Sequence, residues 1–128
     1  KCMTPGSHGS TFGGNPLAMS VGNAVLDIIL KKGFLKNVQK TSIYFHNELK
    51  RLHSKYPTVI REIRGVGLLV GIQIYKNQIE FIKKLFDRGL LTVKASENVV
   101  RLLPPLTVKK KNIDEAVEIL EKVCKTYK

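Results

Sequence analysis

The sequence predicts an α+β fold in which helices cover one face of a small, mostly antiparallel sheet. Three observations support this prediction. Apolar residues recur at helical spacing in four segments, whereas β-branched residues and glycines fill the segments between the later helices. The resulting order is loop, two helices, strands, helix, strands, helix. A chain of 128 residues with 43% hydrophobic content is long enough for one modest core and too short for two ordinary domains.

The first part of the chain predicts a loop followed by two helices. Residues 4–14 are rich in Gly, Ser and Thr and show no periodicity, which indicates a loop. Asn15 is placed to cap a helix that Pro16 begins, because proline at the first helical position gives up no needed hydrogen bond. Apolar residues form a stripe along this helix, and Gly33 is a natural stop. The second helix ends near Tyr56, with apolar residues three and four apart along one face.

Two pairs of short strands are predicted in the second half of the chain. From Val59 onward, β-branched residues and glycines indicate two extended segments that meet near Gly65. Residues 90–94 and 98–103 predict two further strands. The prolines at 104 and 105 end this pattern because proline donates no hydrogen bond to a sheet.

Two more helices are predicted from their end signals. Asn77 and Glu80 form a capping-box pattern for a helix from about residue 78 to 88, which Gly89 stops. The last helix is predicted to begin after Asn112. Its inward face comprises Ile113, Ala116, Val117, Leu120, Val123, Cys124 and Tyr127.

The strongly basic composition limits the classes of partner without identifying one. The formal net charge is +12, from 22 Lys and Arg against 10 Asp and Glu, and would attract phosphates, carboxylates, nucleic acid or an anionic membrane surface. The basic residues are spread along the chain, and neither a long basic arm nor interleaved aromatic residues accompany them. This distribution favours a solvated, lysine-rich surface over a nucleic-acid interface.

The cysteines and the apolar segments indicate a cytoplasmic protein that does not cross a membrane. Cys2 and Cys124 lie at opposite ends of the chain, in no spacing typical of zinc or redox chemistry, so reduced thiols are expected. No apolar run approaches the roughly 18–20 residues of a membrane span, and no secretory signal pattern is present. The chain begins at Lys1 and reaches a glycine-rich loop within six residues, from which we expect it to be part of a longer protein.

The segment PGSHGSTFGGNPLA, residues 5–18, is the most informative in the chain because it places hydroxyls, a histidine and several glycines directly before a helix. Backbone N–H groups at such a position can bind a phosphate, and Ser10 and Thr11 offer additional hydroxyl donors. The segment matches neither a P-loop nor a G-x-G-x-x-G pattern. The residues alone therefore leave two interpretations open, a phosphate-binding loop and a glycine-rich linker.

The eleven residues HGSTFGGNPLA resemble the signature loop of class III aminotransferases of the ornithine and acetylornithine type. These are enzymes that use pyridoxal 5'-phosphate (PLP). The resemblance implies that Thr11 binds the PLP phosphate of the neighbouring subunit in a homodimer with shared active sites. It also implies that Ser10 lies beside it, near the substrate. His8 would line the loop, although a lone histidine is more often structural than catalytic.

Two later segments resemble the same family in the same order. RGVGLLVGIQI, residues 64–74, is similar to a strand of the family's small C-terminal domain, and we expect it to be structural. Arg64 in this segment is expected to form a surface ion pair. VVRLLPPL, residues 99–106, is similar to the segment whose arginine, Arg101 here, lies near the substrate carboxylate. An arginine suits that task because its planar fork pairs bidentately with a carboxylate and stays charged.

The resemblance also implies what the chain lacks. In this family the lysine that forms a Schiff base with PLP precedes the loop, as do the residues that contact the PLP ring, and no lysine of this chain lies in a matching context. We therefore expect no catalytic residue in this chain and no activity from it alone. The implied division is a PLP-phosphate loop at the end of the large domain (1–14), connecting helices (15–56) and a small C-terminal α+β domain (57–128).

The leading hypothesis is the C-terminal part of an acetylornithine aminotransferase, which exchanges an amino group between N-acetylornithine and 2-oxoglutarate in arginine biosynthesis. Other class III donors, namely ornithine, succinyl-diaminopimelate and 4-aminobutyrate, remain open, because most residues that select the donor would precede this chain. A different class of function also remains open, a non-catalytic basic binding module that would show salt-dependent affinity for DNA or RNA.

Overall fold

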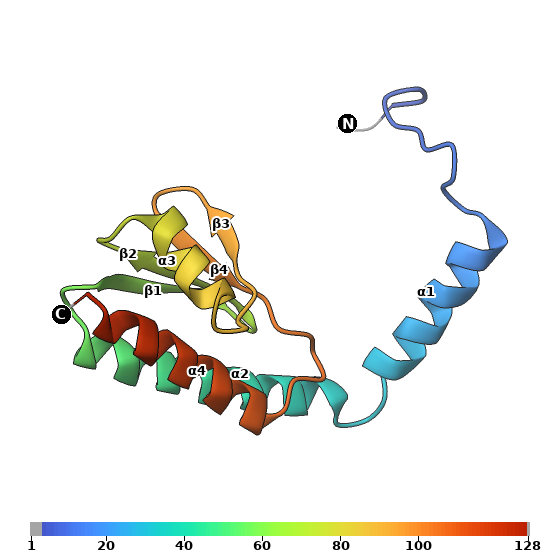
Figure 1. The fold of residues 1–128 in the computed structure, drawn as a ribbon. Coiled ribbons are helices and arrows are strands. Elements are labelled where there is room, and N and C mark those ends of the chain that lie inside the picture. The colour runs from blue at the N-terminus through green and yellow to red at the C-terminus, as the bar shows by residue number, and fades with distance from the viewer. Residues whose placement is uncertain (1–3, 128) are drawn as a thin grey trace. The chain divides into compact units, whose positions relative to one another are not determined.

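The computed structural model describes residues 4–127 of the chain. These residues form two compact units that divide after Leu35, and each unit is described by itself. The first unit contains the glycine-rich loop and the helix α1 (Pro16–Ile29). The second contains a four-stranded sheet and the helices that pack on it (Figure 1).

Helix α1 begins where the sequence predicts. The Asn15 side chain accepts a hydrogen bond from the Ala18 backbone N–H at 2.9 Å, and its amide donates to the Phe12 carbonyl at 2.7 Å. Pro16 occupies the first turn. The helix ends at Ile29, and Gly33 adopts a left-handed backbone (φ 89°) in the turn that follows. Within residues 16–29 no side chain is buried, so the apolar stripe of α1 lacks a partner inside its own unit.

The second unit follows the predicted order of elements. Helix α2 spans Phe34–Lys55, strands β1 and β2 span Ile60–Val66 and Leu69–Ile74, and helix α3 spans Gln78–Phe86. Strands β3 (Val93–Ala95) and β4 (Val99–Leu102) precede helix α4 (Lys110–Lys125). The sheet has the order β1-β2-β4-β3 with every neighbouring pair antiparallel. This arrangement confirms the predicted α+β fold and its antiparallel sheet.

The core lies between the sheet and its helices. Val70 and Ile72 on β2 pair with Leu102 and Val100 on β4, and all four side chains are buried on the same face. Helices α2 and α4 run side by side across this face (Figure 1), where the Lys55 ammonium reaches Glu121 at 2.6 Å. The core contributed by the helices comprises Phe45, Leu49, Leu52, Phe81, Leu85, Ile113, Leu120, Val123 and Cys124. On the opposite face of the sheet, side chains such as Leu69 and Arg101 are exposed.

The turn between β1 and β2 lies close to Gly65, as the sequence predicts, and begins at Gly67. Strand β1 continues through Gly65, which pairs with Val70, and Gly67 (φ 64°) begins the turn. Gly65 itself has φ 127°, and a Cβ there would lie 2.1 Å from the Leu69 carbonyl oxygen. The glycine at 65 therefore permits a close approach of the two backbones inside the hairpin and is not the turn residue.

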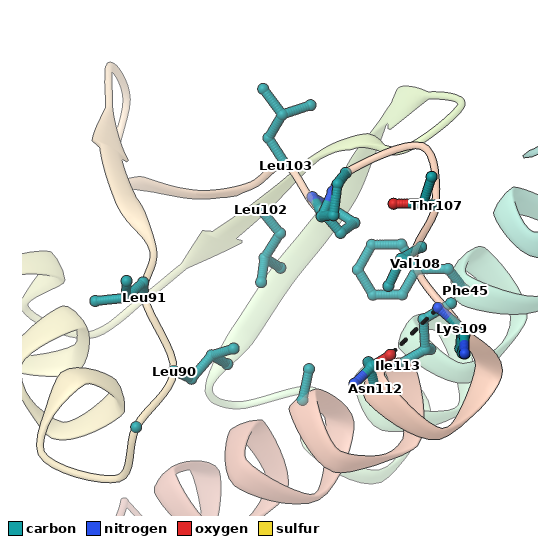
Figure 2. Close-up of a pocket in the computed structure, with 14 residues that line it drawn as sticks. Phe45, Leu90, Leu91, Leu102, Leu103, Thr107, Val108, Lys109, Asn112 and Ile113 are labelled. Atoms are coloured by element: carbon teal, nitrogen blue, oxygen red, sulfur yellow. Dashed lines mark hydrogen bonds between the residues drawn. The ribbon is translucent and has the colours of Figure 1, made fainter. Parts of the chain in front are cut away.

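The N-terminal ends of α3 and α4 differ in part from the predicted ones. Asn77 caps α3 as predicted and accepts from the N–H groups of Ile79 and Glu80, but the Glu80 carboxylate pairs with Lys84 at 2.8 Å. Helix α4 begins at Lys110, so the prediction that it starts after Asn112 was wrong. Asn112 is the third helical residue, and its side chain accepts from the Lys109 N–H at 3.3 Å (Figure 2). Asn112 therefore lies within the first turn of α4, where its side chain accepts from the free N–H of the N-cap residue Lys109, and it is not itself the N-cap.

The connection between β3 and β4 is short and strained. Glu97 and Asn98 both have positive φ, 59° and 61°. The Asn98 side-chain amide stabilises this turn because it donates to the Ile74 carbonyl and, at 2.8 Å, to the Lys76 carbonyl. The Gln73 amide donates to the Glu97 carbonyl at 2.9 Å. The turn is thus held against the end of β2.

Of the two cysteines, Cys2 lies outside the described residues and Cys124 is completely buried on α4. Burial raises the pKa of the Cys124 thiol to about 12, with a smaller contribution from nearby Glu121. Because the thiolate is the reactive form, the folded protein is expected to leave Cys124 unmodified by a disulfide reagent at pH 8, whereas denaturant exposes it. In a Cys2→Ser variant, the absorbance of the thiolate released from the reagent measures the modification of Cys124 directly. Rapid modification in buffer would contradict the described packing of α4.

Candidate functional site

The glycine-rich loop presents two hydroxyl groups without internal partners. Ser10 and Thr11 are exposed, and neither hydroxyl makes a hydrogen bond within residues 4–127. A Cβ on Gly13 would lie 3.0 Å from the Ser10 Cβ, so glycine lets the chain fold back close to Ser10. Gly14, with φ 75°, then directs the chain into the Asn15 cap. The loop therefore carries two free hydroxyls a few residues before the N-terminus of α1, an end of the helix that favours an anion because of its backbone N–H groups and dipole.

Arg101 lies on the face of the sheet that points away from the core. Its neighbours Val100 and Leu102 are buried, and strand alternation directs the side chain between them to the opposite face. The guanidinium makes no hydrogen bond or ion pair with any residue in the described range 4–127. The guanidinium N–H groups of Arg101 are thus free to donate to a ligand, as the predicted carboxylate-binding role requires.

An open groove of about 410 Å³ surrounds Arg101. Its lining includes Arg64 from β1, Gly71 from β2 and Val99 from β4. A Cβ on Gly71 would lie 2.8 Å from the Val99 Cγ1, so any side chain at this position would fill the floor of the groove. The missing side chain of Gly71 therefore keeps the space beside Arg101 open.

Arg64 forms the surface ion pair that the sequence predicts. Its guanidinium donates to the Glu97 carboxylate at 3.0 Å, and its Nε lies 4.0 Å from the Glu62 carboxylate. Arg64 also lines the groove of Arg101, and the prediction of a purely structural segment missed this. The signal would have been a hairpin formed by RGVGLLVG whose second strand pairs with the strand of Arg101. This order sets residues 64 and 101 on either side of Gly71.

A larger hollow of about 570 Å³ lies on the core side of the sheet (Figure 2). Its walls are mainly apolar, with Phe45 from α2, Leu102 from β4 and Ile113 from α4 among them. Leu90 and Val108 also line it. The polar groups of this hollow are few, and none of the residues predicted for the site lies in it. Size alone therefore does not identify the site that the sequence predicts.

The predicted site residues fall in two separate units. Ser10 and Thr11 are adjacent in the first unit, whereas Arg101 belongs to the second unit and lies beside Arg64. The part of the chain that the structure describes contains no group of three or more His, Cys, Asp or Glu residues able to hold a metal ion. None of its helices is both long and apolar enough to span a lipid bilayer.

Comparison with known proteins gives one family. Residues 1–124 match the family model of class-III aminotransferases. An acetylornithine aminotransferase of Brucella melitensis is 48% identical over 121 residues, which are 94% of this chain and 30% of that protein. An ornithine aminotransferase structure from Plasmodium yoelii aligns with a TM-score of 0.85 at 35% identity and covers 98% of this chain and 34% of its own. An acetylornithine aminotransferase structure from Elizabethkingia anophelis gives 0.82 at 34% identity, over 97% and 32%. This chain thus spans about a third of the length of these relatives.

Proposed function

Because this chain belongs to the class III aminotransferase family, we propose that it forms the C-terminal part of an acetylornithine aminotransferase. The longer enzyme would transfer an amino group between N-acetylornithine and 2-oxoglutarate. The observation that carries this proposal is the 48% identity to an acetylornithine aminotransferase, together with an unpaired Arg101 in an open groove. Cytoplasmic localisation and a function without nucleic acid or membrane binding belong to the same proposal.

Enzymes of this family use PLP, and the loop of this chain fits its phosphate. The Thr11 hydroxyl is exposed and unbonded within the described residues, and it precedes a helix N-terminus that favours an anion. The Thr11 hydroxyl would donate a hydrogen bond to a phosphate oxygen of PLP bound by the partner subunit of a homodimer. Bound PLP would supply an electron sink for breaking the C–H bond at the substrate carbon that carries the reacting amino group.

Arg101 and Ser10 would act on the substrate. The Arg101 guanidinium would bind a substrate carboxylate bidentately and so fix the orientation of the amino or keto carbon. Ser10 would border the substrate beside Thr11. The residues then divide into a PLP-phosphate loop (1–14), connecting helices (15–56) and a small α+β domain (57–128). The lysine that anchors PLP would lie in the part of the enzyme that precedes this chain.

Ornithine is a second candidate for the amino donor. The structure from Plasmodium yoelii, an ornithine aminotransferase, aligns over 98% of this chain, which supports a related donor. N-Acetylornithine carries an amide where ornithine carries a second ammonium group. Comparing kcat/KM for the two donors in the longer protein separates the candidates.

Thr11→Val in the longer protein is expected to weaken PLP binding by about 10- to 100-fold, because a hydrogen bond to a charged group contributes about 1.5–3 kcal/mol. Titration of the PLP-free protein with PLP, followed by absorbance, measures the Kd. Thr11→Ser keeps the hydroxyl and should retain most of the affinity. Ser10→Ala is the matched control in the same loop and should leave the PLP Kd nearly unchanged.

Activity provides the second part of this test. The longer protein should catalyse amino transfer from N-acetylornithine to 2-oxoglutarate, whereas the 128-residue chain mixed with PLP should not. Equal PLP affinity in Thr11→Val and in the unaltered protein would exclude the proposed phosphate contact. Absence of transamination with every donor of this class would exclude the proposed function.

A further inference from the structure

Two arginines face the same side of the sheet across a glycine. In the strand pairing, Arg64 on β1 is opposite Gly71 on β2, and Gly71 is opposite Arg101 on β4. Residues directly opposite each other on neighbouring strands share a face, and strands lie about 4.8 Å apart. The Cα atoms of the two arginines are therefore roughly 10 Å apart across the sheet. Both side chains line the same groove.

The Arg64 side chain leans across β2 toward this groove. Its Cγ lies 3.6 Å from the position that a Cβ of Gly71 would occupy, so its aliphatic stem covers the glycine. Its guanidinium then reaches Glu97 in the turn that leads into β4. Arg64 thus spans from one edge strand toward the strand that carries Arg101.

The carboxylates that hold Arg64 are exposed and replaceable. The side chains of Glu97 and Glu62 are 68% and 56% exposed, and that of Arg64 is 40% exposed. Ion pairs with this exposure contribute little stability, so a second carboxylate can compete for the same guanidinium. Arg101 has no such carboxylate partner within residues 4–127 and is the stronger attractor of the two.

We propose that Arg64 is a second cation of the Arg101 groove, and that it makes this groove prefer dicarboxylates over monocarboxylates. Arg101 binds one carboxylate of the ligand. Arg64 attracts the second carboxylate, which competes with the Glu97 carboxylate for the Arg64 guanidinium. The inference rests on the proposed carboxylate-binding role of Arg101. It assigns to Arg64 a part in distinguishing a dicarboxylic keto acid such as 2-oxoglutarate from a substrate with one carboxylate.

Opposite effects of two substitutions separate this role from a purely structural ion pair. Arg64→Met removes the charge and keeps an unbranched stem over Gly71, whereas Glu97→Gln removes the competitor and leaves Arg64 in place. Either substitution breaks the ion pair, so a structural role predicts the same direction for both. An anion-binding role predicts weaker binding for the first and tighter binding for the second.

The experiment titrates the 128-residue chain with glutarate and, separately, with acetate at low salt, and follows the backbone amide signals of Gly71 and Arg101 by NMR. Arg64→Met is expected to raise the glutarate Kd by about 3- to 5-fold and to leave the acetate Kd within about 2-fold, the range of exposed ion pairs. Glu97→Gln is expected to lower the glutarate Kd by about 2-fold or more. Arg101→Met should weaken both ligands.

Lys94→Met is the matched control for general attraction by the basic surface, since Lys94 is exposed on β3 and does not line the groove. An effect of Lys94→Met equal to that of Arg64→Met would overturn the proposal, as would an unchanged glutarate Kd in Arg64→Met. Weaker glutarate binding in both Arg64→Met and Glu97→Gln would show a structural pair only. The titration needs neither PLP nor turnover. Selective glutarate binding by an enzyme that fails to transaminate would therefore contradict the proposed function alone.

Discussion

Arg101→Met is expected to lower kcat/KM for 2-oxoglutarate in the longer protein by about 100-fold or more. A bidentate pair between guanidinium and carboxylate contains two charge-assisted hydrogen bonds, each contributing about 1.5–3 kcal/mol. A loss of about 3 kcal/mol corresponds to about two orders of magnitude in rate. Steady-state kinetics with varied 2-oxoglutarate measures the effect.

Arg101→Lys separates charge from geometry in this prediction. Lysine keeps the positive charge and loses the planar fork, so only part of the activity should return. The melting temperature of both variants should stay close to that of the unaltered protein, because the Arg101 guanidinium makes no hydrogen bond or ion pair within residues 4–127. If Arg101→Met changes kcat/KM by less than about 3-fold, the carboxylate-binding role is wrong.

Gly65→Ala is expected to lower the free energy of unfolding by about 3 kcal/mol or more. Alanine at φ 127° is strained, and its Cβ would lie 2.1 Å from the Leu69 carbonyl oxygen. That oxygen belongs to the paired backbone of β2, so relief requires the hairpin itself to shift. Urea denaturation of the 128-residue chain, followed by circular dichroism, measures the change.

Gly67→Ala provides the comparison within the same hairpin. Gly67 also has a left-handed backbone (φ 64°), but a Cβ there would meet no atom within 4 Å. Its cost should be only about 1–2 kcal/mol, which is the backbone penalty alone. Equal destabilisation by the two alanines would show that the close approach at Gly65 carries no energy of its own.

The sequence predicted elements more reliably than it predicted their boundaries. Long periodic segments such as α2 and α4 form helices as expected, although α4 begins earlier than predicted, because the spacing of apolar residues depends only on helix geometry. The error at Asn112 and the limited precision at Gly65 share a cause. Asparagine near a helix start can cap the helix or accept a hydrogen bond from within its first turn, and glycine in a strand can mark a turn or a close backbone approach. The choice depends on partners that are remote or lie across a turn.

The candidate site could be predicted only where a motif carried it. Thr11, Ser10 and Arg101 came from the resemblance to class III aminotransferases, and the comparisons confirm that family. The structure adds that Arg101 is unpaired in the described chain and that Gly71 keeps its groove open. The joint placement of Arg64 and Arg101 depends on the register of three strands, which neither periodicity nor composition specifies.

A glycine substitution at residue 97, intended to stabilise the protein, would also change the surroundings of Arg64. Glycine is the usual replacement at a positive φ, and at residue 97 (φ 59°) it would relieve backbone strain. The same change would delete the carboxylate that holds Arg64 at 3.0 Å. A more heat-resistant protein obtained in this way would also carry a retuned ligand preference, so stability and selectivity cannot be engineered independently at this position.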